Sequence, residues 1–185
     1  MSENLEMPIA QHELHKIIGD ILLHEFGDSV RLDFACSRTN DDRQQLPLFS
    51  SVLKSRKTQL CKVDILILEK NEVKVIVEIE ESGIIPTKIC GKMLTSGLAK
   101  YYIPHKQRAV PIANPLLFIQ ILNSKNIPDN SSIKKQWVNI EAALKRIGEI
   151  GGRQLCYKLL FGESENFSKT HSKGLIETIR KFLVI

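Results

Sequence analysis

Apolar runs divide the chain into segments with the periodicity of strands or helices. Residues 63–68 and 73–79 are mostly β-branched or leucine, and four polar residues, 69–72, separate them, a spacing typical of a β-hairpin. Both faces of these two segments are largely apolar. We therefore expect the hairpin in the middle of a sheet that is covered on both sides.

The other apolar segments extend this hairpin into an alternating order of helices and strands. Apolar stripes at helical spacing predict helices over residues 8–26, 86–102, 131–150 and 173–183. Continuous apolar runs predict further strands over residues 30–36, 116–122 and 154–161. With no internal repeat and no low-complexity tract, the chain is predicted to be a single α/β domain over residues 1–185, in the order α-β-β-β-α-β-α-β-α.

The composition adds a modest positive charge to this picture. The 26 lysine and arginine residues outnumber the 21 aspartate and glutamate residues, which gives a net charge of +5. That excess favours an anionic partner such as DNA. The polar stretch of residues 37–57, predicted to be a loop, carries five basic residues that can contact phosphates, although a solvated loop explains them equally well. These residues are Arg38, Arg43, Lys54, Arg56 and Lys57.

Nothing in the sequence indicates a membrane or secreted protein. No apolar run approaches the length of a membrane-spanning helix, and the first residues lack the basic end and apolar run of a secretory signal. The four cysteines are dispersed, without a C-x-x-C pair, so we expect reduced thiols in a cytoplasmic protein.

Three carboxylates interrupt the apolar hairpin. Glu78 and Glu80 share a face, because side chains two apart on a strand point the same way, and the hairpin would bring Asp64 beside Glu78 if its register allows. Carboxylates stay charged in an apolar interior only if something compensates them, and an oxygen-only ligand set suits Mg²⁺ or Mn²⁺. The alternative is that these residues lie at a solvated edge of the sheet.

Asp64, then thirteen residues, then Glu78-Ile79-Glu80 and a helix: this pattern resembles the PD-(D/E)xK nuclease superfamily. That family has an Asp at the start of one strand and (Asp/Glu)-x-Lys in the next. The resemblance implies a restriction-endonuclease-like fold, with an αβββαβ core and a mixed central sheet flanked by helices. Val63 stands where the family often has Pro, and Glu80 stands where it has Lys.

The resemblance also implies a metal site and a reaction. Asp64, Glu78 and the backbone carbonyl of Ile79 would hold Mg²⁺ or Mn²⁺, and a glutamate of the first helix, Glu13 or else Glu25, would complete the site. The implied activity is that of a metal-dependent DNA endonuclease of restriction, junction-resolving or repair type. Cutting both strands of a duplex would require a homodimer of such a one-site domain.

The missing family lysine has two candidate replacements. Lys88 and Lys92 lie a turn apart on the predicted helix after Glu80, close enough to offset charge on a phosphate. Glu80 itself would orient or deprotonate the attacking water. If the site is inactive, the chain is instead a nuclease-fold module that binds nucleic acid or a protein partner. A third possibility is a plain α/β protein whose strand carboxylates are solvated.

Two further motifs each have two interpretations. His12 and His15 have the i, i+3 spacing of a metal pair, but the sequence shows no third ligand, which favours solvated histidines. The segment from Gln45 to Phe49 is similar to the Q-L-x-L-F peptide that docks on the bacterial sliding clamp. We favour the interpretation that its Leu46, Leu48 and Phe49 pack the loop onto the core.

Overall fold

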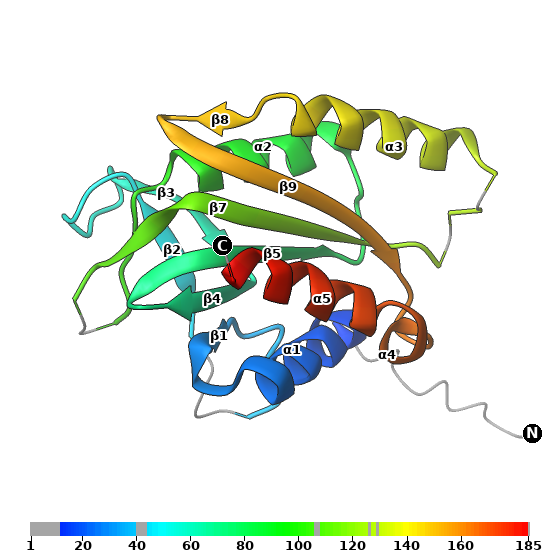
Figure 1. Ribbon diagram of the computed structural model, residues 1–185, viewed down its shortest axis with the longest axis horizontal. Helices are drawn as coiled ribbons and strands as arrows, with labels where there is room; N and C mark the ends of the chain where they lie inside the picture. The colour runs from blue at the N-terminus through cyan, green and yellow to red at the C-terminus, as the bar shows by residue number, and fades with distance from the viewer. Residues whose placement is uncertain (1–11, 40–43, 106–107, 126, 129, 185) are drawn as a thin grey trace, which may run out of the picture.

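The computed structural model describes residues 12–39, 44–105, 108–125, 127–128 and 130–184. The strands are β1 (Val30–Leu32), β2 (Leu46–Phe49), β3 (Gln59–Val63), β4 (Ile65–Glu69), β5 (Glu72–Glu80), β6 (Tyr101–Tyr102), β7 (Val110–Asn123), β8 (Glu149–Ile150) and β9 (Arg153–Gly162). The helices are α1 (Glu13–Phe26), the 3-10 turn η1 (Gly27–Ser29), α2 (Pro86–Leu98), α3 (Ser132–Lys145), α4 (Phe167–Thr170) and α5 (Ser172–Leu183). The predicted mixed α/β architecture is confirmed (Figure 1).

The strands join into one mixed sheet whose centre is parallel. Its order is β1-β4-β5-β7-β6-β2-β3, with β9 pairing β7 and β8 pairing β9 off that path. The pairs β5–β7 and β7–β9 are parallel, and the other pairs are antiparallel. The β4–β5 hairpin closes at Lys70 and Asn71, whose φ angles of 51° and 62° are those of a two-residue type I′ turn.

Helices cover both faces of the central strands, as the apolar pattern predicts. On one face α2 and α3 pack over Ile76 of β5, and on the other α1 and α5 pack over Val77 and Ile79 (Figure 1). Alternation along β5 therefore divides its side chains between two separate cores. Both cores consist mainly of buried aliphatic residues, joined by a few aromatic ones.

The structure corrects several predicted boundaries. The segment 37–57, predicted to be a loop, contains β2, and the chain then continues into β3. Both strands are too short for their periodicity to stand out in the sequence. The predicted helix 86–102 ends at Leu98, because Tyr101–Tyr102 pairs with β2 and β7 as strand β6. The predicted helix 131–150 ends at Lys145, and its last two residues form β8.

The segment that resembles a clamp-binding peptide is a core strand. Leu46, Leu48 and Phe49 are almost completely buried in β2, which pairs with β3 on one side and β6 on the other. This is the favoured interpretation, in which the segment packs onto the core. Docking on a clamp would require β2 to leave the sheet.

A close contact fixes the depth of α1. A Cβ at Gly19 would lie 2.4 Å from the carbonyl oxygen of Cys36, which follows β1. Only glycine allows the helix to approach the backbone this closely. The contact sets how closely α1 packs against the segment that follows β1.

Two further predictions concern membrane-spanning helices and the state of the cysteines. Within the described ranges, no helix has the length and apolar character needed to cross a membrane. The four cysteines, Cys36, Cys61, Cys90 and Cys156, are free thiols, as expected, and Cys36 is fully buried.

Candidate functional site

The candidate site lies where the β4–β5 hairpin opens. Ile65 pairs with Val77, so the next position places Asp64 opposite Glu78, as predicted. Before Ile65 the chain departs to β3, which pairs with β2, while β5 continues to Glu80. The backbone N–H of Ile79 donates to the Oδ2 atom of Asp64 at 2.7 Å. The carboxylate of Asp64 thus takes the hydrogen bond that the backbone of a longer β4 would have accepted from Ile79.

Ile79 also presents its carbonyl at this opening. The N–H and C=O groups of one residue in a strand point to the same edge. Because the N–H of Ile79 points to Asp64, its carbonyl faces the same gap. The structure thus brings the carbonyl proposed as a ligand to the side of Asp64.

Two lysines of α2 meet the strand carboxylates. The Nζ atom of Lys92 lies 2.6 Å from Oε2 of Glu78 and 2.8 Å from Oε1 of Glu80. The Nζ atom of Lys88 lies 2.7 Å from Oε2 of Glu80. Both glutamates are buried, with exposed fractions of 0% and 3%. We call Glu78, Glu80, Lys88 and Lys92 the lysine cluster.

Burial and crowding of charge govern the protonation of this cluster. Burial, and then the charge of Asp64, raise the pKa of Glu78 well above its usual range, and Lys92 offsets this only in part. Burial alone would lower the pKa of Lys92, but the charges of Glu78 and Asp64 and hydrogen bonds to Glu78 and Glu80 outweigh it and raise that pKa. The cluster therefore keeps an ammonium group inside a partly buried site.

The same site satisfies the chemical requirements for a divalent cation. The Oε1 atom of Glu78 is buried and has no hydrogen-bond partner among the described residues. Asp64, Glu78 and the carbonyl of Ile79 offer only oxygen donors, which suit Mg²⁺ or Mn²⁺. Lys92 already shows that this position attracts a positive charge. The residues present therefore fit the metal that the sequence predicts.

Two neighbours of the site were not predicted from the sequence. Asp33 donates its backbone N–H to the carbonyl of Asp64 at 2.9 Å, and burial followed by the charge of Asp64 raises the pKa of its carboxyl. Gln120 is fully buried and pairs in register with Glu78 across β5 and β7. Its Oε1 atom accepts a hydrogen bond from Tyr157, at 3.2 Å. The only sequence signal for Gln120 is a lone amide in an otherwise apolar strand.

The structure corrects the interpretation of His15 as solvated. Its side chain is buried, and its Nδ1 atom lies 2.6 Å from Oε1 of Glu81, which also accepts the backbone N–H of His15 at 3.0 Å. Its Nε2 atom lies 3.8 Å from Oδ2 of Asp64. His12 is exposed, as expected, and His24 near the end of α1 is exposed too.

The two glutamates predicted to complete the site pair with arginines instead. Glu13 lies 3.6 Å from Arg38, and Glu25 forms an ion pair with Arg180. The residue of α1 that the structure does bring to Asp64 is His15.

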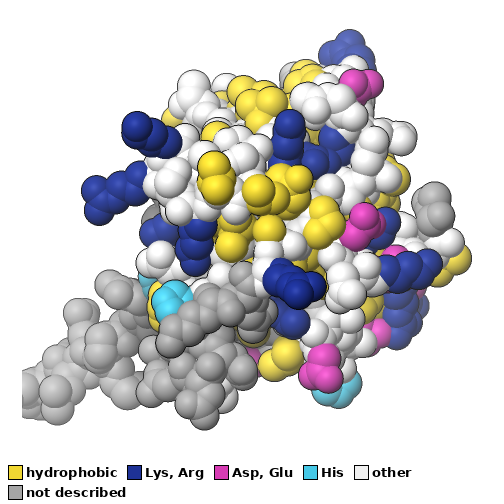
Figure 2. Space-filling view, turned by 90° about the vertical axis from the view of Figure 1, so that its left-hand side faces the viewer, with side chains coloured by type: hydrophobic (Ala, Val, Ile, Leu, Met, Phe, Trp, Pro, Cys, Tyr) yellow, Lys and Arg dark blue, Asp and Glu magenta, His cyan; other side chains and the backbone are white. Residues whose placement is uncertain are grey.

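The basic residues predicted to contact phosphates fall into three groups. Arg38 is bound to Asp20 at 2.5 Å and to Glu13, and Arg43 lies outside the described residues. The others, Lys54, Arg56 and Lys57, are exposed in the loop between β2 and β3. Lysine and arginine side chains protrude on the face of the molecule that carries this loop (Figure 2). The five residues of β3 separate the loop from Asp64 by about 16 Å.

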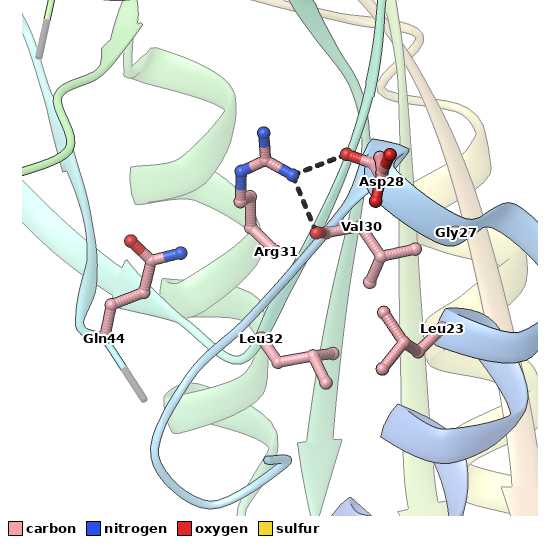
Figure 3. Close-up of a pocket in the computed structure, with 7 residues that line it drawn as sticks. All are labelled: Leu23, Gly27, Asp28, Val30, Arg31, Leu32 and Gln44. Atoms are coloured by element: carbon pink, nitrogen blue, oxygen red, sulfur yellow. Dashed lines mark hydrogen bonds between the residues drawn. The ribbon is translucent and has the colours of Figure 1, made fainter. Parts of the chain in front are cut away.

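A pocket of about 440 Å³ lies apart from this site, beside β1 and the end of α1 (Figure 3). The guanidinium of Arg31 points into it and donates to the backbone carbonyls of Asp28, at 2.6 Å, and Val30, at 2.9 Å. The pocket contains no residue of the carboxylate site. It is therefore a separate surface pocket, in which hydrogen bonds to the backbone hold the Arg31 side chain in place.

Comparison of the chain with protein-family models, with curated proteins and with solved structures gives no match. What the fold and the site define is thus a class: a mixed α/β protein with a buried carboxylate–lysine cluster at the end of a parallel strand pair.

Proposed function

We propose that this protein is a metal-dependent nuclease that hydrolyses phosphodiester bonds in DNA. The observation that carries the proposal is the meeting of Asp64, Glu78, Glu80 and Lys92 at the opening of the hairpin. The element order α1-β1-β4-β5-α2-β7, with β2, β3 and the short β6 inserted, supports a restriction-endonuclease-like αβββαβ core.

Asp64, Glu78 and the carbonyl of Ile79 would hold Mg²⁺ or Mn²⁺. When bound there, the ion would stabilise the charge that develops on the phosphate and make the attacking water more acidic. Glu78 would be the more deeply buried ligand, because its Oε1 atom is buried and has no hydrogen-bond partner among the described residues.

The remaining residues of the site would position water and balance charge. Glu80, held by both lysines, would accept a proton from the attacking water as the phosphorus–oxygen bond to the leaving group breaks. Lys88, whose side chain is 48% exposed, can turn towards a phosphate without leaving the helix. Lys92 is held between two glutamates, so it would act from a fixed position.

Cleavage assays with a matched carboxylate control test this proposal. Supercoiled, linear, branched and single-stranded DNA would be incubated with Mg²⁺ or Mn²⁺ and wild type, Asp64→Asn or Glu69→Gln. Glu69 lies on the same hairpin but outside the cluster. We expect cleavage of at least one DNA form by wild type and by Glu69→Gln, and none by Asp64→Asn. Absence of cleavage by wild type on every form would reject the enzyme.

A specific observation favours a second candidate, a non-catalytic DNA-binding module. Lys88 and Lys92 already neutralise Glu78 and Glu80 without any added ion. Such a module would bind DNA with a strong dependence on salt, and its binding would be the same in Asp64→Asn. Binding without cleavage by wild type would establish this candidate.

A further inference from the structure

A second group of metal-binding side chains lies on the opposite side of β5 from the lysine cluster. His12, His15 and Glu81 each present one ligand atom, and these atoms lie within 4.8 Å of one another. The two imidazole rings meet edge to face, with centroids 5.2 Å apart. We call these three residues the histidine cluster.

The chain brings these residues together from two distant segments. His12 and His15 stand at the start of α1, and Glu81 immediately follows β5. Because successive strand residues alternate in direction, Glu80 reaches α2, and Glu81 reaches α1. His12 has a φ of 68°, in the left-handed region that residues other than glycine seldom adopt. The ring of His12 nevertheless lies against that of His15.

We propose that the histidine cluster binds a divalent transition metal ion, with His12, His15 and Glu81 as its ligands. Two imidazoles and one carboxylate suit Zn²⁺, Co²⁺ or Mn²⁺, whereas Mg²⁺ prefers oxygen donors alone. Tetrahedral coordination at ordinary bond lengths separates ligand atoms by about 3.4 Å. The Nδ1 atom of His15 and Oε1 of Glu81 are 2.6 Å apart, so they need to separate by under about 1 Å.

Three protein ligands leave a coordination position open, and two of them are accessible to solvent. His12 is exposed. Glu81 lines a pocket of about 400 Å³ together with Ser82, Asn123 and Ile133. A water molecule or an anionic oxygen can therefore reach the ion, as in zinc sites that retain an exchangeable ligand.

This inference does not depend on nuclease activity. The histidine cluster shares no ligand with the site formed by Asp64, Glu78 and Ile79, although Nε2 of His15 lies 3.8 Å from Oδ2 of Asp64. A metal at the histidine cluster can therefore exist in a protein that cuts no DNA. The two sites can also be inactivated separately.

Co²⁺ is a direct probe, because its visible absorption reports both binding and coordination geometry. The intact protein would be titrated with Co²⁺ and then back-titrated with Zn²⁺. We expect one equivalent to give a spectrum that Zn²⁺ abolishes. Wild type without a visible Co²⁺ spectrum would overturn the inference.

Variants identify the ligands. His12→Ala removes an exposed side chain, so the fold should be preserved, and His24→Ala is a matched exposed control on the same helix. Loss of even a group that only supports a ligand weakens metal affinity about 10–100-fold, so we expect His12→Ala to weaken Co²⁺ binding by at least about tenfold. His24→Ala should bind as wild type does. Equal affinity of His12→Ala and His24→Ala would overturn the assignment.

A further variant separates this site from the proposed nuclease site. The double variant Asp64→Asn, Glu78→Gln removes two of the ligands proposed for Mg²⁺ and leaves all three residues of the histidine cluster. We expect it to retain the Co²⁺ spectrum even if DNA cleavage is lost or was never present. If the double variant lost the spectrum and His12→Ala kept it, the ion would belong to the carboxylates instead.

Discussion

The end of β5 supplies carboxylates to both sides of the sheet, and the two sides treat them differently. In the lysine cluster, Glu78 and Glu80 form ion pairs with the ammonium groups of Lys88 and Lys92. In the histidine cluster, Glu81 meets His15, a group that can be neutral and can bind a metal. Each glutamate of the lysine cluster therefore has a lysine as counter-charge, although Oε1 of Glu78 has no hydrogen-bond partner among the described residues, whereas Glu81 has a potential metal ligand as its partner.

This difference also separates stability from function. A buried glutamate that is paired only with a lysine makes the fold depend on that lysine, because removing the lysine leaves a buried charge without compensation. Glu81 contacts the ring of His15 and also accepts the backbone N–H of the same residue, so it keeps one partner if the ring is removed. Removing one partner at a time tests this difference between the two clusters.

The largest effect is expected from Lys92→Met. Removing one partner of a buried ion pair costs about 3–5 kcal/mol, and Lys92 is the only described contact of the buried Glu78 with a cation. Lys88→Met is the control, since Glu80 would keep Lys92. Urea unfolding would measure both free energies. Equal unfolding free energies for the two variants would contradict the assigned importance of Lys92.

A divalent ion should give the next largest effect. Mg²⁺, which prefers oxygen donors alone, would at 100 times its dissociation constant raise the free energy of unfolding by about 2.7 kcal/mol, provided that the unfolded chain does not bind it. The increase should disappear in Asp64→Asn and persist in Glu69→Gln. Thermal unfolding with and without the ion would measure it, and a rise of the same size in Asp64→Asn would place the ion elsewhere.

A smaller effect is expected from Glu81→Gln. The amide oxygen can still accept the backbone N–H of His15, but the charge-assisted bond to its ring is lost, which corresponds to about 1–2 kcal/mol. Unfolding in urea would check this value. A loss of unfolding free energy as large as that of Lys92→Met would show that the fold depends equally on the histidine cluster and the lysine cluster.

The smallest change in stability is expected from Gln120→Leu, which has a similar volume. The substitution removes a buried amide nitrogen without a partner among the described residues, but it also leaves the hydroxyl of Tyr157 without Gln120. The two changes oppose each other, so the net change should stay under about 1 kcal/mol. Unfolding curves would measure it, and a loss above about 2 kcal/mol would indicate a polar network that stabilises the core.

Local pattern was enough to predict that the hairpin and the helix after it bring the carboxylates and lysines of the candidate site together. The exact pairing also depends on an irregularity between Ile67 and Leu68, because the register at the turn alone would place Asp64 opposite Val77 rather than Glu78. Helical spacing on α2 aligns Lys88 with Lys92, and the short connection after β5 brings both to the glutamates. Each of these contacts depends on residues fewer than thirty positions apart.

Contacts across the chain were not predictable in this way. His15 and Glu81 are 66 residues apart, and no periodicity relates the rotation of α1 to the end of β5. The same rotation turns Glu13 towards Arg38 and puts His15 in the place expected for a glutamate. Strands β2 and β3 were missed because pairing with each other, rather than their own short pattern, makes them strands.

Gly19 has a consequence for anyone who wishes to redesign this protein. It stands one turn after His15, and even one added methyl group would collide with the carbonyl of Cys36. The residue at position 19 thus determines the distance between α1 and the backbone at Cys36. A substitution there would lift the first turn of α1 and separate His15 from Asp64 along with it. Libraries that aim to tune the histidines therefore need to leave this glycine unchanged.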